Sequence, residues 1–245
     1  MKKFKKMLSI GLTILMTFAM IFPSYATNEI DYGDIDGVEV IEREGQLEIN
    51  YTEQREDGLY YISETVNGNT INSQIYKVEN GEKILSSTMV GDINGGEVSC
   101  IETNSDGSIE QYEVRAEING TYDEQIQTQI DFSTLGGSKK YLRTEEYGIS
   151  LVGKKVTIAA AAAAIVAVTA YVSLPVAVKI ITAAIAAGTG NGVNNLPNYL
   201  YVTSDIYRTH SVGKIYTRYV NKYYLDAART QYFGTWTFSK RAGRK

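Results

Sequence analysis

The chain has 245 residues, of which 44% are hydrophobic and 21% charged, so it is long enough to bury a core in one large domain or two smaller ones. Its single cysteine, Cys100, and single histidine, His210, exclude an intramolecular disulfide and a zinc site of the usual histidine and cysteine ligands within one chain. The net charge of −4 hides two halves: residues 27–147 carry 26 acidic and 8 basic residues, and residues 148–245 carry 2 and 12. Such asymmetry predicts a membrane, a nucleic acid or an internal partner for the basic half.

Residues 1–26 have the pattern of a cleavable secretory signal peptide. A lysine-rich start is followed by the apolar run Met7–Phe22 and by the small residues Ser24 and Ala26. We expect cleavage between Ala26 and Thr27, and a secreted, extracellular protein that meets no nucleic acid. The alternative is an uncleaved N-terminal anchor, although the apolar run is short for one.

Residues 27–135 are predicted to form an acidic β-rich domain. Turn dipeptides recur every 10 to 14 residues, and the segments between them alternate polar and apolar side chains, which is typical of consecutive hairpins with one buried face. We expect an antiparallel meander of about seven or eight strands. Residues 136–155, which begin with Gly136 and Gly137, are predicted to be a linker.

Residues 156–192 form an apolar segment rich in alanine and glycine. Positions 156–187 contain 13 alanines and no acidic residue, and Pro175 divides them into two predicted helices. As a helix, the first part would span about 28 Å, close to the hydrocarbon thickness of a membrane of about 30 Å. Its insertion energy is marginal at roughly −3 kcal/mol, and Lys179 opposes insertion of the second part. The small residues also predict self-association of these helices.

Nine apolar residues of this segment are the predicted membrane-engaging side chains: Val156, Ile158, Ile165, Val168, Val172, Leu174, Ile180, Ile181 and Ile185.

Residues 193–245 are predicted to be a basic, tyrosine-rich tail containing a β-hairpin. Aromatic and basic side chains alternate over residues 215–223, and the aromatic faces suit a membrane interface or stacking on sugars. Contact with an anionic membrane or envelope is assigned to Lys154, Lys155, Lys179, Arg208, Lys214, Arg218 and Lys222.

Together these segments predict an α+β fold with an N-terminal antiparallel meander, a central alanine-rich helical hairpin and a C-terminal tyrosine-rich β-hairpin. The sequence contains no catalytic motif, no zinc-binding HExxH, no phosphate-binding loop and no EF-hand spacing. We therefore expect a non-enzyme without catalytic residues, bound metal or cofactor.

This order of parts, and the tail motifs Tyr207-Arg-Thr, Tyr223-Tyr-Leu-Asp-Ala-Ala-Arg-Thr230 and Gly234-Thr-Trp-Thr, resembles the large secreted bacteriocins of the geobacillin 26 type. The resemblance implies an antimicrobial protein of a Gram-positive bacterium that inhibits its relatives, with no catalytic residues to carry over. The expected function is therefore membrane-active, bacteriocin-like killing. Two alternatives stay open: a surface protein anchored through residues 156–174, and a soluble secreted binding module with the helices buried.

Overall fold

A computed structural model describes residues 37–94, 97–120, 139–154, 157–169, 171–188, 192–193, 196–211 and 214–241, without the side chains of residues 209–211, 214 and 241. The predicted signal peptide, with Ala26 and Thr27, lies outside the described residues. The described residues fall within one compact unit, Asp34–Lys245.

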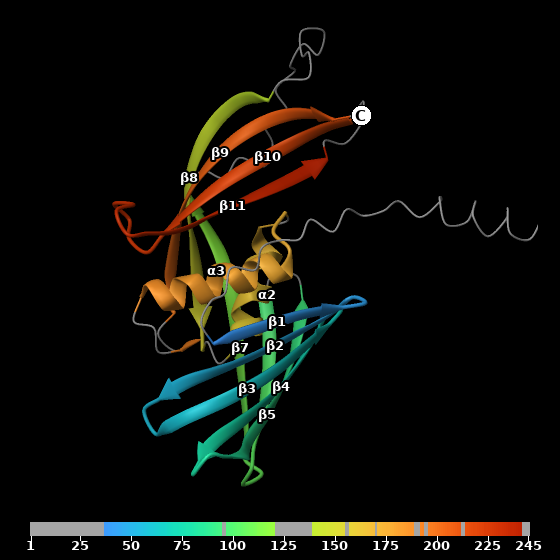
Figure 1. Cartoon of the computed structure of the whole chain (residues 1–245), viewed down its shortest axis with the longest axis vertical. Helices are drawn as coiled ribbons and strands as arrows, with labels where there is room; N and C mark the ends of the chain where they lie inside the picture. Colours follow the sequence, from blue (N-terminus) through green and yellow to red (C-terminus); the bar gives the residue numbers. More distant parts are fainter. Residues whose placement is uncertain are drawn as a thin grey trace, which may run out of the picture. The chain divides into compact units, whose positions relative to one another are not determined.

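Eleven strands of the described chain form a single antiparallel sheet in which each strand pairs with its neighbours in sequence (Figure 1). Their bounds are β1 Val38–Arg43, β2 Gln46–Arg55, β3 Gly58–Asn67, β4 Thr70–Glu79, β5 Glu82–Asn94, β6 Glu97–Asn104, β7 Ile109–Gly120, β8 Lys140–Gly153, β9 Tyr199–Ser211, β10 Lys214–Tyr224 and β11 Tyr232–Arg241.

The predicted α+β fold class is wrong, because the fold is dominated by this one sheet. Most of the predicted linker forms β8, which pairs with β7 on one side and with β9 on the other. The tail consequently extends the sheet by three strands instead of forming a separate hairpin. The physical reason is the apolar content of β8, whose residues Tyr147–Leu151 are buried and require cover.

The first strands connect through tight turns at the dipeptides that the sequence marks. Between β4 and β5, Asn80 and Gly81 adopt φ angles of 53° and 84°. Two successive positive φ values are the requirement of a type I′ turn, whose twist matches that of the flanking strands.

Two helices lie within the unit, α2 over Ile158–Val168 and α3 over Leu174–Ala187. Pro175 stands in the first turn of α3, where its missing N–H costs no hydrogen bond. Neither described helix has the length and apolar character that crossing a membrane requires.

The helices pack on the inner face of the sheet, which is the face of the alternating buried residues. Helix α2 contacts β5 to β8, whereas α3 contacts α2 and both edge strands, β1 and β11 (Figure 1). Because β8 and β9 flank the helices in sequence and are paired, the chain before and after the apolar segment belongs to one sheet. An anchor that placed these strands on opposite sides of a membrane would have to break that pairing.

Candidate functional site

The most unusual feature of the inner face is that it encloses a helix with no polar side. Ala159 to Ala164 are each at most 1% exposed, and they are flanked by the buried residues Ile158 and Ile165. Methyl side chains allow the helix axis to approach the sheet closely. They contribute little each, however, at about 0.8 kcal/mol per buried methyl group against 1.5–3 kcal/mol for a leucine or isoleucine side chain.

The sheet and the N-cap residue satisfy the free N–H groups at the start of α2. The N–H of Ile158 donates to the hydroxyl of Tyr51 at 3.1 Å, and that of Ala159 donates to Glu64 Oε2 at 3.0 Å. The N–H of Ala160 donates to Oγ1 of the N-cap Thr157 at 3.3 Å. The three donors that have no partner within the helix are thereby paired in a buried position.

Glu64 is a carboxylic acid buried at 0% exposure in the middle of β3. Burial raises its pKa to about 7, and hydrogen bonds from Thr157, the Ala159 N–H and Ser73 hold the pKa below the value that burial alone would produce. The Oγ of Ser73 donates to Glu64 Oε1 at 3.1 Å. A group with this pKa changes charge near neutral pH.

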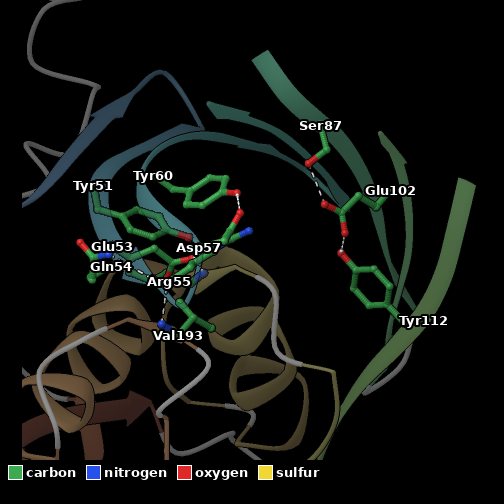
Figure 2. A network of polar contacts seen from close by, with 11 residues as sticks. Tyr51, Glu53, Gln54, Arg55, Asp57, Tyr60, Ser87, Glu102, Tyr112 and Val193 are labelled. Carbon is green, nitrogen blue, oxygen red and sulfur yellow. Dashed lines mark hydrogen bonds and ion pairs between the residues drawn. The ribbon is translucent and has the colours of Figure 1, made fainter. Parts of the chain in front are cut away.

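A second carboxylate binds the chain after it leaves α3. Glu53 on β2 accepts the N–H of Val193 at 3.0 Å through Oε2, and the Arg55 guanidinium pairs with Oε1 at 2.5 Å (Figure 2). Gly192 lies so close that a Cβ atom there would stand 2.7 Å from Glu53 Oε2, and its φ of +123° also favours glycine. The close approach depends on the absence of a side chain at residue 192.

Arg55 is itself positioned by a small cluster at the β2–β3 turn (Figure 2). Its guanidinium lies 4.6 Å from the centroid of the Tyr60 ring, and the Tyr60 hydroxyl donates to Asp57 Oδ2 at 2.6 Å. Lys77 pairs with the same Asp57 oxygen at 3.3 Å. These contacts fix the arginine that neutralises Glu53.

The turn between the helices is held by Tyr171. Its ring stacks on Tyr219 with centroids 4.5 Å apart and an interplanar angle of 5°, and its hydroxyl lies 2.8 Å from that of Tyr147. Asn221 Nδ2 donates to both of these hydroxyls, at 3.1 and 3.3 Å. We call the contacts of Tyr51 and Glu64, of Tyr171, and of Glu53 the start, middle and exit clasps of the helix pair.

A third buried carboxylate faces inward on β6. Glu102 accepts a hydrogen bond from Ser87 Oγ at 2.7 Å, and the Tyr112 hydroxyl approaches its other oxygen at 3.5 Å (Figure 2). The neighbouring Cys100 is buried, and burial, followed by the charges of Glu64 and Glu102, raises the pKa of its thiol to about 12. Such a thiol is an inert core residue.

A cavity of about 80 Å³ lies between the start and exit clasps, lined among others by Tyr51, Glu53, Thr182 and Gly192. Pockets for organic ligands usually measure 300–1,000 Å³, so this one has room for water molecules only. No group of three or more potential metal ligands occurs among the described residues.

The structure places most of the predicted membrane-engaging residues in the core. Val168 and Leu174 are half-buried, and Val156 lies outside the described residues. The buried members are Ile158, Ile165, Val172, Ile180, Ile181 and Ile185. In this conformation they contact the sheet and each other, so a membrane would meet them only after the helices leave the sheet.

The predicted cationic residues do not form one cluster. Lys154 pairs with Glu110 at 2.6 Å, whereas Lys179 is buried on α3. Arg208, Arg218 and Lys222 lie on the neighbouring strands β9 and β10, where Lys222 pairs with Asp205 at 3.2 Å. Lys155 and the side chain of Lys214 lie outside the described part of the chain.

Sequence reasoning missed the clasps, although a signal for them exists. Glu53 continues the inward series of Leu47, Ile49 and Tyr51, and Glu64 stands between the inward Ile62 and Val66. Glu102 follows Val98 and Cys100 in the same way. An acidic residue in the apolar phase of an alternating strand indicates a buried carboxylate with a partner.

No family model, curated protein or solved structure matches the chain significantly.

Proposed function

We propose that the chain is an exported antibacterial protein that perturbs the membrane of competing bacteria with α2 and α3. The observation that supports this proposal most is the enclosed helix pair, in which α2 has no polar side chain and which polar contacts attach to the sheet at three points. A helix without a polar face suits either a protein core or a lipid environment.

The small packing contribution of alanine supports the release of the helices from the sheet. Six buried alanine methyl groups in α2 contribute roughly 5 kcal/mol, about half or less of what leucine side chains would contribute at the same positions. The five buried isoleucines of the pair contribute more, and the clasps add polar contacts at its start, middle and exit. Breaking the clasps near an anionic membrane would free a mainly apolar helix pair that small residues keep together.

An exposed position in α2 allows a test that leaves the fold intact. Ala167 is exposed whereas Ala163 is 1% exposed. Ala167→Lys should fold normally but oppose insertion by about 2.5–3.5 kcal/mol, and should reduce dye release from anionic vesicles roughly 100-fold. Thr103→Lys, on the outer face of β6, adds the same charge outside the helices and should release dye like the unchanged protein.

Two results would contradict the proposal. Purified mature protein that neither releases dye nor inhibits any of a broad panel of indicator strains is not a membrane toxin. Equal release by the Ala167→Lys and Thr103→Lys variants would show that the helices are not the active part.

The second candidate is a secreted binding module in which the helices are a permanent core. The complete burial of Ala159 to Ala164 favours it. Under this alternative, Ala163→Lys unfolds the protein, Ala167→Lys changes nothing, and vesicles remain sealed in every case.

A further inference from the structure

The outer surface of β8 to β11 carries a larger group of tyrosines than the rest of the described sheet, where Tyr61 and Tyr76 form a pair across β3 and β4. In β9, Tyr199, Tyr201 and Tyr207 point outward, alternating with the buried residues Leu200, Val202 and Ile206. We define the tyrosine face as the outward side chains Tyr141, Tyr199, Tyr201, Tyr207, Tyr224 and Tyr232. Strand pairing sets Tyr141 opposite Tyr207 and Tyr201 opposite Tyr224, so the rings line up across strands.

The rings are held in place before any ligand arrives. Tyr199 and Tyr201 stack with centroids 5.7 Å apart, and Tyr224 meets the ring of Tyr232 edge-on at 5.8 Å. The Tyr199 hydroxyl accepts a hydrogen bond from Asn119 Nδ2 at 2.8 Å, and the hydroxyl of Tyr232 lies 2.9 Å from Thr235 Oγ1. Fixed side chains lose little conformational entropy when they bind.

Hydrogen-bonding side chains lie between the rings. Thr144 donates to Asp205 at 2.5 Å beside the pair of Tyr141 and Tyr207, and Lys222 reaches the other oxygen of Asp205 at 3.2 Å. The ammonium group of Lys139 stands 3.9 Å above the ring of Tyr207. This surface offers aromatic faces together with donors and acceptors.

The tyrosine face also has a small excess of basic side chains. Lys139 and Arg218 adjoin Tyr207, and Lys222 lies beside Asp205, whereas the acidic side chains of β8 and β9 on this face are Glu146 and Asp205. The exposed aliphatic side chains lie mainly elsewhere on the outer surface, including Val90, Ile101 and Ile109 on β5 to β7. A face made for lipid would carry such aliphatic groups, so charge and polarity favour a hydrated anionic ligand.

We propose that the tyrosine face binds an anionic polysaccharide of the bacterial cell wall. Sugar rings present C–H faces that pack on aromatic rings, and their hydroxyl groups bind the intervening threonines and Asp205, while the basic residues meet the anionic substituents. This site deepens the proposed function by naming the envelope component that the protein meets first. The choice of a cell-wall polymer as the ligand rests on the proposed antibacterial function.

The test is sedimentation with purified Gram-positive sacculi that retain their anionic wall polymers. We expect Tyr199→Ala and Tyr232→Ala each to weaken binding about fivefold, and the double variant about 20-fold, because each removes one exposed ring. Tyr199→Phe and Tyr232→Phe keep the ring and should bind within about twofold of the unchanged protein. Ile101→Thr removes an exposed apolar group on β6 and should have no effect.

Removal of the anionic polymers from the sacculi should weaken binding by the unchanged protein. Absence of sedimentation, or equal sedimentation by the double alanine variant, overturns the proposal. Loss of vesicle binding in the double variant with unchanged sacculus binding overturns it too, in favour of a membrane interface.

Failure here is distinguishable from failure of the proposed function. Dye release from vesicles without a wall depends on α2, so the double tyrosine variant should release dye normally while Ala167→Lys still binds sacculi.

Discussion

The carboxylate of Glu64 on β3 accepts the backbone N–H of Ala159, in the first turn of α2, across 95 residues of sequence. The contact joins the acidic half of the chain to its apolar segment. It gives one acidic residue an internal partner at the positive end of the α2 dipole.

Protonation of Glu64 should make stability depend on pH. Because the folded-state pKa of about 7 lies above the ordinary value of 4.5, this residue's contribution is fully present below pH 4.5 and is lost as the pH rises through 7. We expect the free energy of unfolding of the unchanged protein, relative to Glu64→Gln, to fall by about 3 kcal/mol between pH 4.5 and 8. Urea unfolding of both proteins at several pH values measures this difference, because the contributions of the other carboxylates are the same in both proteins. If the unfolding free energies of the two proteins changed in parallel with pH, the raised pKa of Glu64 would be contradicted.

Removing the Tyr51 hydroxyl should destabilise the protein. Tyr51→Phe leaves the buried N–H of Ile158 without an acceptor, which should lower the free energy of unfolding by about 1–3 kcal/mol. Tyr61→Phe is the matched control, since its hydroxyl bonds the partly exposed Asn50 side chain on the outer face. Equal urea midpoints for the two variants would show that the start clasp does not contribute.

A methyl group at Gly192 should break the exit clasp. Gly192→Ala brings Cβ within 2.7 Å of Glu53 Oε2 and strains a positive φ, so we expect a loss of at least 2–3 kcal/mol in unfolding free energy. Gly68→Ala, also at positive φ but with open space around it, should cost about 1 kcal/mol. Glu53→Gly removes both Oε2 and Cβ of residue 53, the two atoms nearest to the added methyl group, and should make the alanine at 192 less costly. If the losses of unfolding free energy from the two single substitutions simply added in the double variant, the contact between residues 53 and 192 would be contradicted.

Cys100 should resist thiol reagents in the folded protein. Its burial and its raised pKa of about 12 leave almost no thiolate at neutral pH. Labelling with iodoacetamide at pH 8 should proceed at least 100-fold faster in 6 M guanidinium than in buffer. Rapid labelling of the folded chain would place the thiol at the surface.

Local sequence patterns predict the positions of the strands better than the pairing of the strands in the sheet. Alternation and turn dipeptides indicate β1 to β7, because a one-sided strand and an Asn-Gly turn each leave a short-range signature. The pairing of β8 with β9 joins residues separated by the whole helical segment, and no short-range signature specifies it. The two glycines at 136 and 137 predict a linker, whereas the apolar run that follows them forms part of β8.

The candidate site was hidden for a related reason. Charge counts assign Glu53 and Glu64 to a solvated acidic half, whereas their phase within the strands assigns them to the core. The position within the strand decides, because successive side chains point to opposite faces and a residue in the inward series must therefore point toward the core. Lys179 shows the same conflict on α3, where it is buried despite its charge.

The order of the strands in the sheet has a consequence for how the chain folds. Each of β1 to β6 pairs with the next strand across a few residues at most, whereas β8 and β9 are separated by the 45 residues that include both helices. Closing such a loop costs about 3 kcal/mol more in chain entropy than closing a two-residue turn. The first strands are therefore expected to assemble early by local zippering, and β9 to β11 to add last, once α2 and α3 have docked and shortened the distance. The final step of folding would thus place β11 against α3, whereas α2 already lies on β5 to β8, and β9 to β11 would be the first strands to part when the protein opens.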